Sequence, residues 1–217
     1  MGYTHQYHNE QLYPCIHVID CFDRGFSKQS FGTAYDITTL AVGAGTIDVT
    51  TTISHVTMVT GAATGNQEGL RIPDPVAVRS REYFAEIAVE LAQIADTEFR
   101  FGFYAAANEY CYIEFDASVN ANWRLTVDDT TGAQFATPTG GAVAQDTVYN
   151  ISLWVETDGT PHWMVGDEYF RDQLLITDLT KKMTASAHYV QFLVKTEADA
   201  AKTADVCHLE TIKLKMH

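Results

Sequence analysis

Alternation of apolar and polar residues between positions 99 and 170 is the feature that most constrains how this chain can fold. In EYCYIEFD, for example, Cys111, Ile113 and Phe115 fall on one side of an extended backbone, and the residues between them fall on the other. Successive side chains of a β-strand point to opposite faces, so a period of two predicts strands with one buried face. Compact turns separate the runs, and the segment is therefore predicted to be an antiparallel meander.

Three short turns support an antiparallel arrangement. Asp158-Gly159 lies between two alternating runs, where an Asp-Gly pair is a strong hairpin signal. Gly166-Asp167 puts glycine first, which suits a type II′ turn and predicts a further hairpin. Residues 128–132 are predicted to close another short hairpin.

The same strand pattern extends on both sides of the meander. β-Branched residues dominate positions 46–60, and alternating runs fill 187–196 and 205–217. Residues 80–96 are ambiguous, because their apolar residues fit a helical spacing as well as alternation, and the pattern alone slightly favours a helix. About twelve strands without a repeated motif predict an all-β antiparallel β-sandwich of the jelly-roll type, which leaves few exposed edges.

The length of 217 residues suits one such domain, predicted to span residues 15–217, with an N-terminal arm at 1–14. The arm shows no clear period of apolar residues. Its three tyrosines, Tyr3, Tyr7 and Tyr13, are predicted to contact a neighbouring subunit.

The formal net charge of −14, from 14 basic and 28 acidic residues, argues against polyanionic ligands. Nucleic acids and anionic membranes bind to positively charged protein surfaces, so neither is predicted as a partner. No apolar run approaches the roughly 20 residues of a membrane helix. No secretory signal is evident, so we expect synthesis in a cytosol. The charge is interpreted as favouring solubility, with attraction to a basic protein surface as the alternative.

Neither a metal nor a cofactor is predicted. The four cysteines contain no Cys-x-x-Cys pair, so they indicate neither a zinc site nor a redox motif. His5 and His8 are three residues apart without a third ligand nearby, and the acidic loop residues lack the spacing of an EF-hand. No glycine-rich phosphate loop precedes a helical pattern.

Five motifs follow one another along residues 50–217. They are a Gly-Phe strand end, a strand of the type Ile-x-Phe-Asp, a tryptophan strand, an Asp-Gly hairpin and a closing strand. The matching positions, in the same order, are Gly102-Phe103, then Ile113, Phe115 and Asp116, then Trp123, then Asp158-Gly159, and finally Ile212 and Leu214. This order resembles the concanavalin A-like lectin/glucanase jelly rolls, in the form found in structural proteins of tailed bacteriophages. The matching segment is extended in that group, so the resemblance implies that residues 83–91 form a strand.

The resemblance implies a bacteriophage virion structural protein, most specifically a capsid decoration protein bound noncovalently on the head. Homo-oligomers, trimers above all, would lie over junctions of the major capsid protein or another virion protein. The protein would be made in the host cytoplasm and reside in the virion. The alternative function is a carbohydrate-binding module or a receptor-binding tail component, with a glycan as ligand.

Related glucanases carry two catalytic carboxylates in a Glu-x-Asp-x-Glu strand, which is absent here. The nearest candidates, Glu114 and Asp116, share a predicted strand face with Tyr110 and Tyr112. We interpret this face as solvated and do not predict an enzyme. The outward aromatic residues Tyr110, Tyr112 and Trp154 are candidates for stacking on a glycan or for contacting another subunit, because sugar rings present apolar C–H faces.

Overall fold

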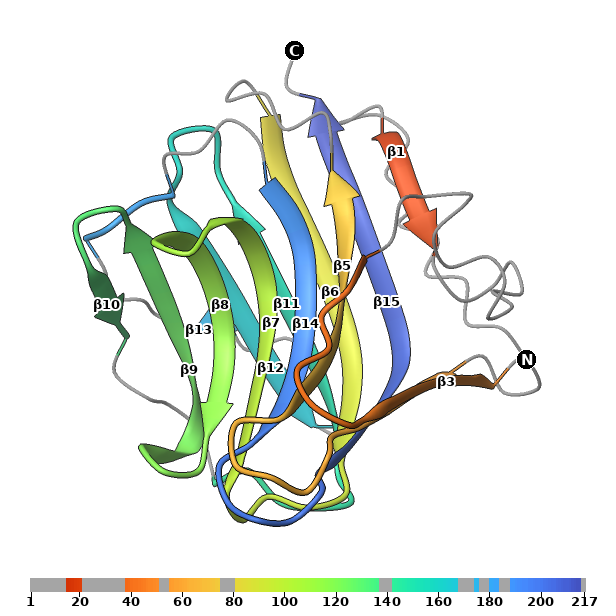
Figure 1. Ribbon diagram of the computed structural model, residues 1–217. Coiled ribbons are helices and arrows are strands. Elements are labelled where there is room, and N and C mark those ends of the chain that lie inside the picture. The colour runs from red at the N-terminus through yellow and green to blue at the C-terminus, as the bar shows by residue number, and fades with distance from the viewer. Residues whose placement is uncertain are drawn as a thin grey trace.

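The computed structural model describes residues 15–20, 38–50, 55–74, 81–136, 142–167, 174–175, 180–183 and 188–215. These residues form fifteen strands and no helix, and hence no helix that could cross a membrane. The described strands form two antiparallel sheets (Figure 1). The predicted arm, with Tyr3, Tyr7 and Tyr13, lies outside the described residues, and the single domain at 15–217 stays a prediction.

One sheet has seven strands, each antiparallel to its neighbours. In spatial order these are β10 (Ala133–Phe135), β9 (Asn120–Asp129), β8 (Glu109–Asp116), β7 (Thr97–Ala106), β14 (His188–Thr196), β5 (Gln67–Asp74) and β2 (Thr38–Thr39). The first part of the meander predicted at 99–170 forms β7 to β10, whereas its part at 148–167 belongs to the other sheet. Strand β14 inserts between β5 and β7 from far along the chain.

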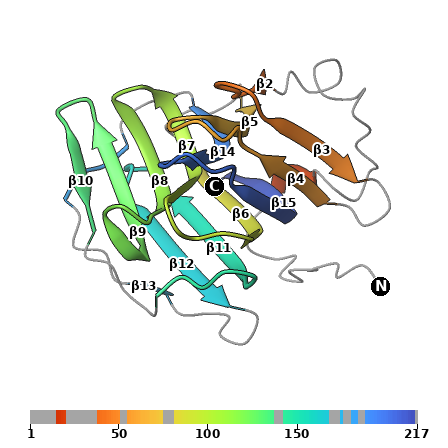
Figure 2. The ribbon, with the colours of Figure 1, turned by 60° about the horizontal axis from the view of Figure 1, so that its bottom comes forward.

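The other sheet has eight strands (Figure 2). In order these are β13 (Leu174–Leu175), β12 (Pro161–Asp167), β11 (Val148–Val155), β6 (Arg81–Leu91), β15 (Thr203–Lys215), β4 (His55–Val59) and β3 (Thr46–Thr50), with β1 (Cys15–Asp20) also paired to β15. Strands β4 and β1 pair with different parts of β15, at Thr203–Val206 and at Glu210–Leu214 respectively.

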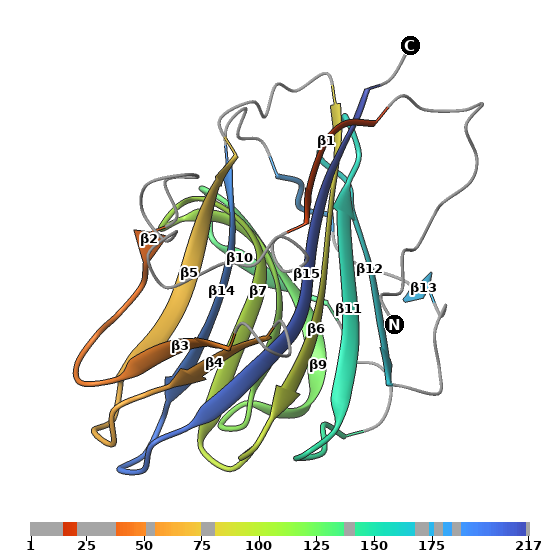
Figure 3. The ribbon, with the colours of Figure 1, turned by 90° about the vertical axis from the view of Figure 1, so that its right-hand side faces the viewer.

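The hydrophobic core lies between the two layers (Figure 3). The alternation predicted its members correctly, because Cys111, Ile113 and Phe115 are buried on the inner face of β8. Trp123 is also buried, and its ring lies 5.5 Å from that of Tyr149 on the opposite sheet. Each large apolar side chain buried in this way contributes about 1.5–3 kcal/mol to folding.

The segment that fitted both a helix and a strand is strand β6, as the resemblance implied. Ala85, Ile87, Val89 and Leu91 are fully buried on its inner face. Strand β6 pairs with β11 on one side and with β15 on the other, so two sets of backbone hydrogen bonds and a buried face outweigh its helical propensity.

The predicted turns have different outcomes. Asp158-Gly159 lies in the loop that joins β11 to β12, where Gly159 has a φ of 87°. Of the hairpin predicted at 128–132, residues 130–132 join β9 to β10. The turn predicted at Gly166-Asp167 is wrong, because both residues still belong to β12. They pair with Asn150 and Tyr149, so β11 offers partners that keep both residues in the strand.

Candidate binding face

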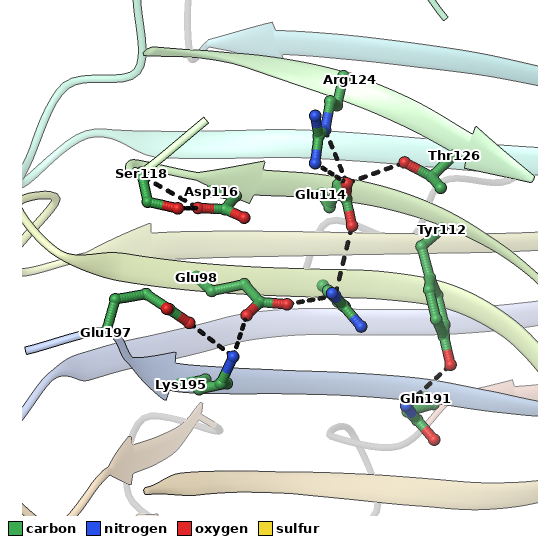
Figure 4. Close-up of polar contacts among 11 residues, drawn as sticks. Glu98, Tyr112, Glu114, Asp116, Ser118, Arg124, Thr126, Gln191, Lys195 and Glu197 are labelled. Atoms are coloured by element: carbon green, nitrogen blue, oxygen red, sulfur yellow. Dashed lines mark hydrogen bonds and ion pairs between the residues drawn. The ribbon is translucent and has the colours of Figure 1, made fainter. Parts of the chain in front are cut away.

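Every second side chain of the seven-stranded sheet points away from the core. On β7, Phe99, Phe101 and Phe103 are buried inside, which leaves Glu98 and Tyr104 on the outer face. The same alternation places Tyr110, Tyr112, Glu114 and Asp116 of β8 on this face, as the sequence predicted. Neighbouring strands bring further polar and aromatic side chains beside them, so this outer face is the candidate functional site (Figure 4).

Four tyrosines, which we call the tyrosine platform, cover one part of this face: Tyr104, Tyr110, Tyr112 and Tyr189. The strand register places Tyr189 opposite Tyr104, and Tyr104 opposite Tyr110. The rings of Tyr110 and Tyr112 are stacked, with centroids 4.8 Å apart and planes inclined by 18°. Tyr189 is 40% exposed whereas Tyr112 is 2% exposed, so the platform has an accessible rim and a buried base.

Arg71 of β5 lies over the tyrosine platform. Its guanidinium carbon is 4.2 Å from the ring centroid of Tyr104 and 5.5 Å from that of Tyr189. Its Nε and Nη2 groups both donate to Oε1 of Gln191, at 3.1 and 2.9 Å. Stacking and hydrogen bonding therefore fix the plane of this guanidinium.

Gln191 also connects Arg71 to the base of the platform. Its Nε2 group donates to the hydroxyl of Tyr112 at 2.9 Å, across the intervening strand β7. The residue of β7 between them in the register is Gly102. Burial raises the pKa of Tyr112, so its hydroxyl stays protonated at neutral pH.

Beside the platform lies an ionic cluster made of Glu98, Arg100, Glu114, Arg124, Lys195 and Glu197 (Figure 4). Glu114 accepts hydrogen bonds from Nε of Arg124 at 2.7 Å and from Oγ1 of Thr126 at 2.9 Å. Its other oxygen lies 3.3 Å from Nε of Arg100. Lys195 bridges Glu98 and Glu197, at 2.7 and 2.6 Å.

The pKa values of two carboxyl groups in the ionic cluster, Glu98 and Glu197, are shifted in opposite directions. Burial raises the pKa of Glu98, although Arg100 and Lys195 favour its ionised form. The hydrogen bond from Lys195 lowers the pKa of Glu197. Within the cluster the carboxyl groups are thus already engaged by the protein's own cations.

The expectation of a solvated carboxylate pair is wrong for Glu114, which is 2% exposed because Arg124, Thr126 and Arg100 surround it. Asp116 has a separate role, since its Oδ1 accepts hydrogen bonds from the backbone N and the Oγ of Ser118 in the turn after β8. The two carboxylates share a face but do not act on a common centre.

Trp154 lies apart from the other predicted site residues. It belongs to β11 of the eight-stranded sheet, where its ring stacks on that of His162 at 5.1 Å with planes inclined by 15°. The tyrosine platform belongs to the seven-stranded sheet. Trp154 and the two predicted tyrosines therefore cannot line one compact site.

The structure adds residues that sequence reasoning missed, above all Arg71, Tyr104, Gln191 and Tyr189. The alternation around each of these residues predicts which face of its own strand it occupies. The local sequence does not show which strands become neighbours in the sheet. Among the described residues, no three His, Cys, Asp or Glu side chains come together to hold a metal ion.

No protein-family model matches the chain, and no curated protein matches its sequence. Solved structures do match. SO2946 from Shewanella oneidensis MR-1, a protein of unknown function, is 12% identical with a TM-score of 0.66, over 91% of this chain and 85% of that one. Peanut lectin is 10% identical with a TM-score of 0.61, over 93% of this chain and 100% of the lectin. The Ca²⁺-bound exoplasmic/lumenal domain of VIP36 is 10% identical with a TM-score of 0.59, over 93% and 91%.

These similarities establish the fold. The chain is an all-β, concanavalin A-like jelly-roll sandwich, as the sequence predicted. Carbohydrate recognition domains, among them that of Emp47p, share this fold.

Proposed function

We propose that the protein is a noncatalytic carbohydrate-binding protein that holds its ligand on the tyrosine platform. The observation that carries this proposal is the layer formed by partly exposed tyrosine rings next to the fixed polar groups of Arg71 and Gln191. A sugar ring has apolar C–H faces and polar edges, and such a layer offers a counterpart for both.

Preorganisation supports binding at this face. The Tyr110 ring is stacked on Tyr112, and the Tyr112 hydroxyl is bonded to Gln191. The Tyr104 ring lies under the guanidinium of Arg71. Side chains that are fixed before the ligand arrives lose little rotamer entropy on binding, which improves affinity.

The state of the carboxylates supports binding without hydrolysis. A glycosidase needs one carboxyl group to protonate the leaving group and a second to act as nucleophile or base. Glu98 and Glu114 are buried and ion-paired with Arg100, Lys195 and Arg124. The lectins and carbohydrate recognition domains among the structural matches also favour a binding role.

A glycan array probed with the wild type and with Tyr104→Ala and Tyr110→Ala tests this proposal. We expect the alanine variants to lose about threefold to tenfold in affinity each, while Tyr110→Phe, which keeps the ring, retains most of the signal. Circular dichroism verifies that each variant is folded. A blank array with folded wild-type protein would contradict carbohydrate binding, and loss confined to Trp154→Ala would move the site to the other sheet.

A second candidate is a virion structural protein of a tailed phage, most specifically a capsid decoration protein that binds noncovalently as a homo-oligomer. The observation favouring it is the motif order of the phage proteins, which here falls on successive elements: Gly102-Phe103 on β7, Asp116 on β8, Trp123 on β9 and Asp158-Gly159 between β11 and β12. The acidic surface would keep particles apart.

Counting copies of the protein per purified particle by mass spectrometry tests the second candidate. Hundreds of copies would support head decoration, with the major capsid protein as partner, and a few copies would support a tail position. Its absence from particles would exclude a virion role. A tail position together with a positive glycan array would unite both proposals in a receptor-binding component.

A further inference from the structure

We propose that the ligand of the tyrosine platform is an acidic glycan, and that the guanidinium of Arg71 binds a carboxylate on its sugar. This inference deepens the proposed carbohydrate binding and rests on it. It names the chemical class of the ligand and the residue that selects it.

Arg71 differs from the other arginines whose side chains the structure describes. Arg100 and Arg124 each pair with a glutamate. Arg71 pairs with no carboxylate among the described residues, and its hydrogen-bond partner is the neutral amide of Gln191. In a chain with 28 acidic and 14 basic residues, a fixed guanidinium without an acidic partner marks a place where an external anion can supply the missing charge.

The free donors of Arg71 have the right geometry for a carboxylate. A guanidinium carries five N–H groups in a planar fork. The Nε group and one N–H of Nη2 are directed to Oε1 of Gln191. The remaining edge, formed by Nη1 and the second N–H of Nη2, can donate two parallel hydrogen bonds to a carboxylate.

The surroundings hold this edge beside the place where a sugar would stack. The guanidinium lies over Tyr104 and near Tyr189, the most exposed ring of the platform. A pyranose stacked on that rim would bring a carboxylate on its own edge toward Arg71. Gln191, itself anchored on Tyr112, keeps the guanidinium from rotating away.

The neighbouring charges do not cancel this local attraction. The adjacent ionic cluster holds three carboxylates and three cations, so its charges balance. Asp128 lies on the same face but on β9, two strands beyond Tyr104. Two strand spacings are about 10 Å, roughly one Debye length at physiological salt, so its repulsion of an anion at Arg71 is weak.

The test compares matched glycans on one array: oligosaccharides ending in glucuronic acid, their methyl esters, and the same chains ending in glucose, with sialylated glycans and their methyl esters as a second set. We expect the wild type to bind at least one acid set about 10-fold or more tightly than its esters. Arg71→Met should abolish this preference and leave weak binding to both forms. Arg71→Lys, which keeps the charge but not the fork, should retain only part of it.

Lys182→Met is the matched control, because it removes an exposed cation that pairs with Asp158 far from the platform. It should leave the preference unchanged. Equal binding of acids and esters by the wild type, with loss of both in Tyr104→Ala, would overturn the role of Arg71 and leave the sugar site standing. A wild type that binds neither form here but binds other glycans on a general array would overturn the acidic-glycan proposal and leave the sugar site standing. No binding on either array would overturn both proposals.

Discussion

Gln191 of β14 donates a hydrogen bond to the hydroxyl of Tyr112 on β8 at 2.9 Å, although strand β7 runs between them. The residue of β7 that lies between them in the register is Gly102. Through this bond the guanidinium of Arg71 is connected to the stacked pair of Tyr110 and Tyr112. Gln191 therefore joins Arg71 and the stacked tyrosine pair in one hydrogen-bonded network.

Gly102→Ala is expected to destabilise the fold by more than about 2 kcal/mol. Gly102 has a φ of 152°, and an added Cβ would lie 2.2 Å from the carbonyl oxygen of Cys111, which belongs to the backbone of the paired strand and cannot move aside. Urea unfolding measures the change. Gly132→Ala is the control, because its φ is 115° but open space surrounds it, so only the backbone penalty of about 1 kcal/mol applies. Equal losses in both variants would contradict the steric explanation.

Glu114→Gln is expected to cost about 3 kcal/mol, because it removes the buried carboxylate that pairs with Arg124, while Arg100 keeps its pair with Glu98. Asp116→Asn, two residues along the same strand, should change stability by less than about 0.5 kcal/mol, since an asparagine can still accept the hydrogen bonds from Ser118. Denaturant unfolding of the two variants side by side measures the difference. If both variants were nearly neutral, the ionic cluster would have no structural role.

The pairing of Asp129 with Lys181 is expected to stabilise the fold at neutral pH and to lose this effect as the pH becomes acidic. The hydrogen bond from Lys181 lowers the pKa of Asp129 from 3.8 to about 2. A carboxyl group with a lowered folded-state pKa stabilises the fold above its unfolded pKa, and this contribution disappears as the pH falls through the folded value. The melting-temperature difference between wild type and Asp129→Asn should therefore be largest above pH 4 and shrink toward pH 2.

NMR titration provides the control for this prediction. In Lys181→Met the pKa of Asp129 should move back up toward 3.8, because its main hydrogen-bond donor is lost. An unchanged pKa in that variant would assign the shift to Thr131, whose hydroxyl also donates to Asp129.

Cys111 is expected to resist alkylation in the folded protein. Its thiol is completely buried in the core, and burial raises its pKa, so both access and the reactive thiolate are suppressed. Peptide mass mapping after iodoacetamide treatment should find Cys111 unmodified in buffer and modified in denaturant. Rapid modification in buffer would mean that β8 opens locally.

Sequence reasoning was strongest where the relevant information is local. Alternation assigned the faces of β8 and β9 correctly, so that Ile113, Leu125 and Val127 are in the core. It failed at Gly166-Asp167, where pairing with β11 keeps the chain extended. Alternation could not distinguish a helix from a strand at β6. That segment is a strand because it pairs with β11 on one side and β15 on the other, whatever its helical propensity.

The candidate site was only half predictable for the same reason. Tyr110 and Tyr112 lie on one strand, and their shared face follows from the period of two. Arg71 and Gln191 are separated by 120 residues, and Gln191 and Tyr112 by 79. The pairing of β14 with β5 and β7 depends on the topology of the whole sheet, so the local sequence could not predict it.

The insertion of β14 between β5 and β7 also has a consequence for the order in which the protein matures. The hairpins β7–β8–β9 join neighbours in sequence, whereas the pairs β14–β5 and β14–β7 join residues that lie far apart in sequence, and long-range pairings form slowly. We expect Tyr104, Tyr110 and Tyr112 to assemble early and Arg71 and Tyr189 to join them only when β14 docks. Pulse-labelled hydrogen exchange should find protection in β8 before β14, and simultaneous protection would contradict this order. Ligand binding would then report on completion of the seven-stranded sheet, since β14, which docks after the β7–β8–β9 meander, brings Gln191, the residue that holds the guanidinium in place.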